Sequence, residues 1–347
     1  MKMELNLAFI GFGTVGKGLA ELLIKKEKEL KQKYNFEPKV VAISDKIKGS
    51  IWKSDGIDLK ELLDTEARTG KVDFYQAPSK GLDPLDTITK TNADVIIEVS
   101  YTNLQTGEPA LTHVKTALTN GKQVVTTNKG PAALSLRGLE ELAEKEGVNF
   151  FYEGTVLSGT PVFSLIRDGL RGAKVKVIEG ILNGTTNYIL TQMEEGKSYE
   201  DALKDAQDEG YAEADPTGDV EGWDATGKIV ILANKLFGGE MSVANVERKG
   251  ITSITPGNIN LAKNKGKRIK LIARASVEGG KIRAKVTPEE LPLTNPLANI
   301  NGATNALTLK TDVLGEVTMV GPGAGKIETG YALLNDLLEL NKRLEKS

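Results

Sequence analysis

The chain has 347 residues, which is too long for one small module and indicates two domains. Its 45 Lys and Arg residues nearly balance its 47 Asp and Glu residues, and no apolar run approaches the roughly 20 residues of a membrane span, so the composition favours a cytoplasmic protein that recruits neither nucleic acid nor membrane. Cysteine is absent and His113 is the single histidine, which excludes thiol nucleophiles and multi-histidine metal sites and leaves acid–base chemistry to lysines and carboxylates.

The chain opens with a glycine turn between a strand and a helix. A buried strand is predicted over residues 5–10 and an amphipathic helix over residues 17–32, with Gly11-Phe12-Gly13-Thr14-Val15-Gly16 between them. In this context the three glycines favour dinucleotide binding over a merely structural turn. They allow a tight turn, a close approach of the pyrophosphate and close helix packing, and the helix N-terminus faces the phosphates.

Further strand–helix units follow. Strands are predicted over residues 39–44, 95–100 and 122–126, with a helix over residues 109–120, and this alternation indicates a doubly wound parallel sheet. Asp45 stands where an acidic residue accepts hydrogen bonds from the adenosine ribose, although it lies farther from the glycine turn than usual. Lys46 and Lys48 either pair with a 2′-phosphate or are solvated loop charges, so the choice between NAD and NADP stays open.

Two later segments carry candidate lysines. Thr127-Asn128-Lys129-Gly130-Pro131 follows the fourth strand, where α/β proteins bind ligands, although by itself this segment favours an ordinary surface turn. Asp224 and Lys228 lie one helical turn apart, as exposed ion pairs often do. The apolar residues 229–233 instead indicate a largely buried helix whose charged start faces a cleft.

The composition changes near residue 150 and predicts a second domain. Small, hydroxyl and amide residues gather at 153–161 and 180–187, and Gly279-Gly280 predicts a hairpin turn within a mixed or antiparallel sheet. Residues 331–343 have the pattern of a helix that returns to the first domain.

Taken together, these motifs give the sequence a specific resemblance. It resembles homoserine dehydrogenase nearly from end to end. The resemblance rests on Gly11-Phe12-Gly13-Thr14-Val15-Gly16, Asn128-Lys129, Glu153-Gly154-Thr155-Val156, Asn183-Gly184-Thr185-Thr186-Asn187, Glu209-Gly210-Tyr211-Ala212-Glu213-Ala214-Asp215-Pro216, the run from Asp219 to Lys228, and Gly321-Pro322-Gly323-Ala324-Gly325.

The resemblance implies a reaction, a fold and an assembly. The family interconverts L-homoserine and L-aspartate 4-semialdehyde with NADP or NAD, on the route to threonine and methionine. It implies an α/β fold, with a Rossmann domain over residues 1–150 completed by residues 320–347 and an α+β domain with a mixed sheet over residues 151–319 for substrate binding and dimerisation. We therefore expect a homodimer that acts on a small molecule, and no kinase or regulatory domain.

The resemblance also assigns roles to individual residues. Lys228 becomes the proton donor and Lys129 the group that orients and polarises the carbonyl. Two converging lysines suit this chemistry, because a free lysine titrates near 10.4 and needs desolvation or a second cation to act as a base near neutrality. The substrate-binding residues are Glu213, Asp224, Asp219, Asn183 and Thr185. The cofactor-binding residues are Gly11, Gly13, Thr14, Val15, Gly16, Asp45, Lys46, Ser100, Lys129, Gly210 and Gly325.

A sodium ion is a further implication of the resemblance, held by oxygens of Glu153, Val156, Ser158 and Thr160. The alternative is a Gly/Ser/Thr loop that satisfies its own backbone, and the sequence does not decide between the two. Two other functions also stay open. One is another NAD(P)-dependent reductase of a small amino-acid-derived carbonyl, and the other is a non-catalytic nucleotide sensor.

Overall fold

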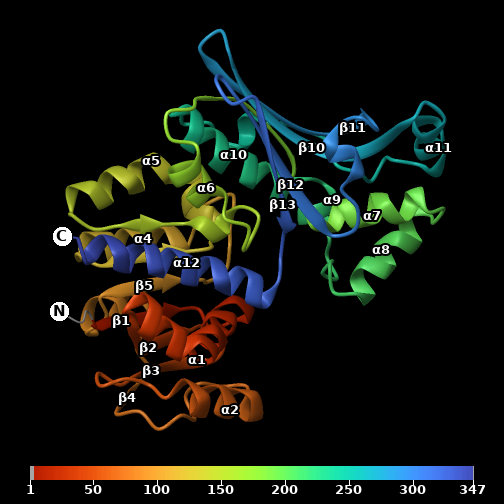
Figure 1. Cartoon of the computed structure of the whole chain (residues 1–347). Helices are drawn as coiled ribbons and strands as arrows, with labels where there is room; N and C mark the ends of the chain where they lie inside the picture. The colour runs from red at the N-terminus through yellow and green to blue at the C-terminus, as the bar shows by residue number, and fades with distance from the viewer. Residues whose placement is uncertain (1–3, 347) are drawn as a thin grey trace. The chain divides into compact units, whose positions relative to one another are not determined.

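The computed structural model describes residues 4–346, which form two compact units (Figure 1). The first unit comprises the chain up to Gly159 together with the segment from Gly325 onward, and the second comprises Thr160–Ala324. The two boundaries predicted from the sequence lie after residues 150 and 319. Within the described residues, no helix is both long enough and apolar enough to cross a bilayer.

The first unit is built on a seven-stranded sheet with the order β4-β3-β2-β1-β5-β6-β7. Its parallel strands are β1 (Glu4–Ile10), β2 (Glu37–Asp45), β5 (Val95–Glu98), β6 (Gln123–Thr126) and β7 (Phe150–Phe151). They are almost continuously apolar because both faces of the sheet are covered: Leu7 and Phe9 belong to one buried cluster, and Ala8 and Ile10 to another. This confirms the predicted parallel sheet.

An antiparallel extension at the β2 edge was not predicted. The short strand β3 (Gly49–Trp52) pairs antiparallel with β2, and the short strand β4 (Ser79–Lys80) pairs antiparallel with β3. At four and two residues they are too short to show a periodic pattern in the sequence.

Helices surround this sheet, and two of them cross at glycines. The helices are α1 (Thr14–Tyr34), α2 (Leu59–Thr69), α3 (Pro84–Lys90), α4 (Ala110–Thr119), α5 (Lys129–Lys145) and α12 (Lys326–Leu344), with a short 3-10 turn η1 (Glu153–Thr155). A Cβ atom at Gly18 would lie 2.0 Å from the carbonyl oxygen of Lys326, and one at Gly330 would lie 2.6 Å from the Gly18 backbone. The final helix, α12, therefore packs directly on α1, although the two helices are far apart in sequence (Figure 1).

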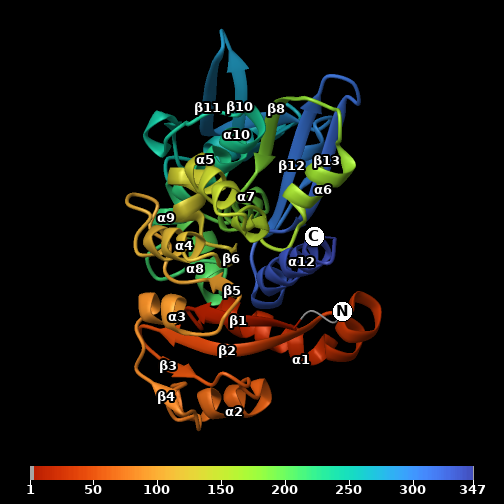
Figure 2. The same cartoon turned by 90° about the vertical axis from the view of Figure 1, so that its left-hand side faces the viewer.

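The second unit contains a six-stranded mixed sheet with the order β13-β12-β8-β10-β11-β9. The strands are β8 (Val175–Ile181), β9 (Glu247–Arg248), β10 (Lys267–Glu278), β11 (Lys281–Pro292), β12 (Thr304–Thr311) and β13 (Glu316–Pro322). Only β9 pairs in parallel among these described strands. The predicted Gly279-Gly280 turn joins β10 to β11, and Figure 2 shows this long hairpin projecting from the sheet.

Six helices and two 3-10 turns complete the described part of the second unit. They are α6 (Val162–Gly169), α7 (Gly184–Glu194), α8 (Tyr199–Asp208), α9 (Thr217–Val220), α10 (Trp223–Phe237), α11 (Pro256–Asn264), η2 (Val243–Asn245) and η3 (Pro296–Asn299). Residues 225–233 of α10 are buried, which confirms the prediction of a buried helix. The α/β fold with a second, mixed-sheet α+β unit is confirmed.

Candidate active site

The glycine turn of the first unit has the geometry of a phosphate-binding loop. Gly11 has a φ of +96°, and a Cβ atom there would lie 2.5 Å from the Val99 carbonyl oxygen, so only glycine fits. Gly13 caps α1, and a Cβ atom there would find no atom within 4 Å. A Cβ atom at Gly16 would lie 3.1 Å from the Gly11 carbonyl oxygen. The turn therefore leaves open space at the N-terminus of a 21-residue helix, where unpaired N–H groups attract phosphate.

Asp45 fixes this turn to the end of β2. Its Oδ2 accepts the Phe12 N–H at 2.7 Å, and its Oδ1 accepts the N–H groups of Ile47 and Lys48 at 2.9 Å each. Burial opposes ionisation of this carboxyl, but the three backbone bonds and the Lys48 charge outweigh it and lower its pKa. Asp45 thus remains ionised beside the glycine turn.

Two lysines near the turn converge on a carboxylate that was not predicted from the sequence. Glu66, on α2, is only 6% exposed and accepts Lys48 Nζ at 2.5 Å and Lys17 Nζ at 3.3 Å. Burial raises the pKa of Glu66, and the two lysines reverse that effect, so the pKa lies below its usual value. Lys46 is exposed, so the two lysines that the sequence analysis treated together differ in their surroundings.

Lys129 begins α5 at the carboxyl end of β6. Asn128 caps this helix: its Oδ1 accepts the Gly130 N–H at 3.1 Å, while its Nδ2 donates to the carbonyl oxygens of Ser100 and Tyr101 at 3.1 Å each. Asn128 is 2% exposed, so the segment is not the ordinary surface turn that its composition alone favoured. The capping amide ties the segments after β5 and β6 together.

In the second unit, Lys228 lies in a cluster of buried polar groups. Its Nζ is 2.7 Å from Asp224 Oδ2 and donates to the Leu182 carbonyl oxygen at 2.7 Å. Asn183 Nδ2 donates to Asp219 Oδ1 at 2.7 Å and to Asp224 Oδ2 at 2.9 Å. The Lys228 and Asp224 side chains are only 8% and 18% exposed, which confirms that this pair is not an ordinary surface ion pair.

The two carboxylates of this cluster influence each other. Burial raises the pKa of Asp219, and the nearby charge of Asp224 raises it further, while Asn183, Lys228 and Thr185 act in the opposite direction. Thr185 also donates its hydroxyl to the Tyr211 carbonyl oxygen at 2.7 Å. A perturbed carboxylate such as Asp219 beside a buried ammonium is typical of an active site.

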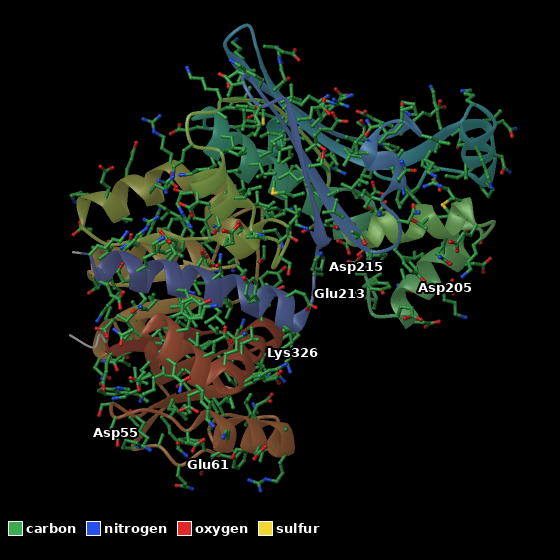
Figure 3. All side chains as sticks on the ribbon, viewed as in Figure 1. Asp55, Glu61, Asp205, Glu213, Asp215 and Lys326 are labelled. Carbon is green, nitrogen blue, oxygen red and sulfur yellow. The ribbon has the colours of Figure 1, made fainter. Side chains whose placement is uncertain are left out.

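The remaining predicted substrate and cofactor residues lie on turns and loops. Glu213 is exposed on the loop between α8 and α9, where Figure 3 labels it together with Asp215. Its backbone carbonyl oxygen accepts a hydrogen bond from Gln207 Nε2 at 3.1 Å. Gly210, with a φ of +76°, ends the turn after α8. In the first unit, Gly325 caps α12 with a φ of +137°.

The predicted cation loop divides between the two units. Glu153 and Val156 are buried, and the backbone N–H of Glu153 donates to Asp336 Oδ2 at 2.9 Å. Ser158 has a φ of +50° and its hydroxyl lies 2.6 Å from that of Thr329. Thr160 belongs to the second unit. Within the described chain, no group of three or more His, Asp or Glu side chains is placed to hold a metal ion.

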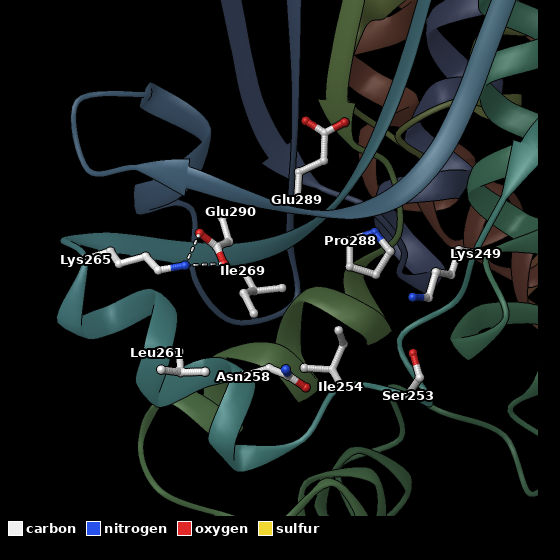
Figure 4. A pocket seen from close by; sticks show the side chains of 10 residues that line it. All are labelled: Lys249, Ser253, Ile254, Asn258, Leu261, Lys265, Ile269, Pro288, Glu289 and Glu290. Carbon is white, nitrogen blue, oxygen red and sulfur yellow. Dashed lines mark hydrogen bonds and ion pairs between the residues drawn. The ribbon is translucent and has the colours of Figure 1, made fainter.

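A separate pocket of about 380 Å³ lies between α11 and the β10–β11 hairpin (Figure 4). It is crossed by the ion pair between Lys265 and Glu290, whose Nζ and Oε1 atoms are 3.3 Å apart. None of its lining residues belongs to the Asp219–Lys228 cluster, so it is not part of the candidate active site.

Comparisons with known proteins decide the family. The profile described as homoserine dehydrogenase matches residues 161–338, and that of its NAD-binding domain matches residues 11–153. The chain belongs to the homoserine dehydrogenase family. It is 43% identical to the homoserine dehydrogenase of Methanocaldococcus jannaschii, covering 99% of this chain and 100% of the relative. It is 42% identical to an NAD(+)-dependent homoserine dehydrogenase of Pseudomonas canavaninivorans, covering 98% and 97%.

A solved structure agrees with the sequence relatives. A hyperthermophilic archaeal homoserine dehydrogenase in complex with NADPH superimposes with a TM-score of 0.84 at 31% identity, covering 98% of both chains. The resemblance and the predicted activity are therefore confirmed: this homoserine dehydrogenase is an NAD(P)-dependent oxidoreductase of amino-acid biosynthesis.

Proposed function

We propose that the chain interconverts L-homoserine and L-aspartate 4-semialdehyde with Lys228 as the proton-transfer group. The observation that carries this assignment is the fixed position of the Lys228 ammonium, held at 2.7 Å by both Asp224 and the Leu182 carbonyl. In aldehyde reduction, the bound reduced nicotinamide supplies the hydride. The Lys228 Nζ–H bond breaks as its proton passes to the substrate oxygen, which becomes the hydroxyl of homoserine.

The reverse reaction uses the same residues. Lys228, in its neutral form, accepts the hydroxyl proton, and the hydride on the same carbon would pass to the oxidised nicotinamide. Asp224 then stabilises the ammonium that forms. Lys129, at the first position of α5, is proposed to orient and polarise the carbonyl oxygen.

The substrate bears an ammonium group, which requires acidic partners. We assign this role to Asp219, Asp224 and Glu213. Asn183 and Thr185 would position these carboxylates and the neighbouring backbone. Asn183 already bonds two of these carboxylates, which supports its assignment as the residue that fixes their spacing.

NAD(P) is assigned to the first unit, and we propose that NAD is preferred. The residues fit the cofactor, since Gly13 leaves room for the pyrophosphate at the N-terminus of α1. The ionised Asp45 would accept hydrogen bonds from a ribose hydroxyl and repel a 2′-phosphate, while Lys48 is already paired with Glu66. We also assign cofactor binding to Ser100, Thr14, Val15 and the remaining predicted cofactor residues.

A sodium ion at the loop after η1 is part of the proposal. Leu157 and Ser158 both adopt left-handed backbone conformations, with φ of +54° and +50°, so the loop curls sharply next to the buried Glu153. A curled loop directs carbonyl oxygens toward a common point, and oxygen ligands suit a hard cation. A crystallographic map from crystals grown in sodium salts tests the site, and contacts of water-like length at the loop would reject it.

The assembly and location are proposed from the family and the composition. We propose a cytoplasmic homodimer, to be tested by light scattering coupled to size exclusion and by fractionation of cells expressing the tagged chain. A single species at the mass of one chain would reject the dimer.

Spectrophotometric assays test the proposed reaction. The purified chain should oxidise NADH or NADPH with aspartate semialdehyde and reduce NAD⁺ or NADP⁺ with homoserine, with a higher kcat/KM for NAD than for NADP. Turnover of another small aldehyde or imine but not of homoserine would identify a different reductase. Folded protein that binds the nucleotide without turnover would identify a sensor.

A further inference from the structure

A buried carboxylate lies next to the proposed cofactor residue Ser100 and has no role in the proposed reaction. Glu98 is the last residue of β5 and is 0% exposed. Its Oε1 accepts the Ser100 N–H at 3.2 Å and the Ser100 hydroxyl, and lies 3.3 Å from Nδ1 of His113, the single histidine of the chain. Two Ser100 donors and a ring nitrogen of His113 thus converge on one oxygen.

The network continues from Glu98 to the segment that carries Lys129. The Thr126 hydroxyl donates to the Glu98 carbonyl oxygen at 2.6 Å, lies 3.4 Å from Glu98 Oε2, and accepts the Asn128 N–H at 3.0 Å. Asn128 closes a ring by donating its amide to the Ser100 carbonyl oxygen. Glu98 therefore contacts both chain segments that leave the sheet at this edge.

The same network also touches the glycine turn. The Gly11 backbone packs so closely on Val99 and Ser100 that a Cβ atom at Gly11 would lie 2.9 Å from the Ser100 nitrogen. A shift of Ser100 would be transmitted to this turn. Glu98 thus contacts Ser100 and Thr126 directly, and through them it is linked to the glycine turn and to the start of α5.

A charged side chain at this position needs a reason. Burial of a carboxylate is costly unless it is hydrogen-bonded, and an apolar residue would complete the core of β5 without that cost. Hydrogen bonds to an ionised acceptor are stronger and shorter than neutral ones, and therefore fix their donors more tightly. The carboxylate consequently suits a task of precise placement rather than one of packing.

We propose that Glu98, oriented by His113, is a positioning residue for hydride transfer. It sets Ser100 and the Asn128–Lys129 segment relative to the glycine turn, and so aligns the nicotinamide with the substrate carbonyl. The inference rests on the proposed function, which places Ser100 at the cofactor and Lys129 at the carbonyl.

A matched pair of threonines gives the sharpest test. Thr126 and Thr91 are both buried, and each donates its hydroxyl to a backbone carbonyl oxygen, at 2.6 Å and 2.7 Å, but only Thr126 lies next to Glu98. Thr126→Val and Glu98→Gln should each lower kcat by about 10- to 100-fold, the range expected for a small misplacement of reacting groups. Thr91→Val should leave kcat within about twofold of wild type.

The readout must distinguish alignment from stability. We would measure kcat, the aspartate semialdehyde KM, and the primary isotope effect in aldehyde reduction with reduced cofactor deuterated at the transferred position. Misalignment should slow the hydride step and raise the isotope effect on kcat, while the aspartate semialdehyde KM changes less than threefold. Glu98→Asp, which keeps the charge, should recover part of kcat.

Several outcomes would overturn the inference. Native kcat and a native isotope effect in Glu98→Gln would do so, as would a loss of activity that only follows the folded fraction measured by circular dichroism. If Glu98→Gln fails to fold, Thr126→Val decides the question by the same criteria. Wild-type protein without homoserine activity would instead refute the proposed function.

Discussion

The strongest prediction concerns removal of the Lys228 ammonium. In Lys228→Met the apolar stem of the side chain is largely retained, while the contacts to Asp224 and to the Leu182 carbonyl oxygen are lost. If Lys228 transfers the proton, kcat should fall by about 10²- to 10⁴-fold, which corresponds to roughly 3–5 kcal/mol on the activation barrier.

The same substitution should also lower stability, and the structure sets the size of that effect. Breaking a buried ion pair costs about 3–5 kcal/mol, because one charge is left without its partner. Asp224 keeps the hydrogen bond from Asn183 at 2.9 Å, so the lower end applies. About 3 kcal/mol in a unit of this size should lower Tm by roughly 6–12 °C.

Steady-state kinetics and thermal melting separate these two effects. The assays are run well below the melting transition, with cofactor Kd measured by quenching of protein fluorescence, which should change little. Lys235→Met is the matched control, because Lys235 lies on the same helix but is exposed. A kcat for Lys228→Met within threefold of wild type would remove Lys228 from the proton transfer.

Three further predictions follow from the cofactor site and from a buried lysine. Gly13→Val should raise the cofactor Kd at least about tenfold by filling the space for the pyrophosphate. Tm should change little, because a Cβ atom at Gly13 meets no protein atom within 4 Å. Native cofactor affinity would contradict the placement of the pyrophosphate. Neutralising Lys46 and Lys48 together should leave the ratio of NAD to NADP affinity nearly unchanged in titrations, because Lys48 is paired with Glu66 and Lys46 is exposed; a selective loss of NADP affinity would show that these lysines read the 2′-phosphate. Burial lowers the pKa of Lys270, which is 0% exposed, from 10.5 to about 8. Below pH 8 Lys270 is protonated in both the folded and the unfolded states, so the cost of burying its charge fully lowers stability. Between pH 8 and 10.5 Lys270 is largely neutral in the folded state and protonated in the unfolded state. The free energy of unfolding should therefore rise with pH across this window by up to about 3 kcal/mol. Denaturant titrations at pH 7.5 and 10 should show this rise in wild type and not in Lys270→Met, and identical slopes would refute it.

Local patterns were sufficient for much of the fold. The glycine turn, the parallel strands and the Gly279-Gly280 hairpin each depend on residues adjacent in sequence, so their signals are complete within a short window. The burial of Asp224 and Lys228 was predictable for the same reason, since the apolar residues that cover their helix follow them directly.

Contacts between distant residues account for what the sequence did not show. Glu66 meets Lys17 from 49 positions away, and Glu98 meets His113 from 15 positions away. Neither carboxylate has a periodic or spacing signal of its own. The predicted strand over residues 95–100 ends early for a related reason, because Ser100 turns its N–H toward Glu98 instead of continuing the ladder. An acidic residue at the end of an apolar strand was the one available sign of this turn.

Each unit builds its part of the site with the same local device. Asn128 and Asn183 both follow a strand and cap the next helix with the amide oxygen, which accepts the N–H of Gly130 and of Thr186. Aspartate or serine would cap equally well, but only asparagine retains an amide N–H₂ to donate elsewhere. In one unit that group holds the backbone after β5, and in the other it holds the two carboxylates beside Lys228. A capping preference that reads in the sequence as a simple helix start therefore also fixes the groups on which the chemistry depends.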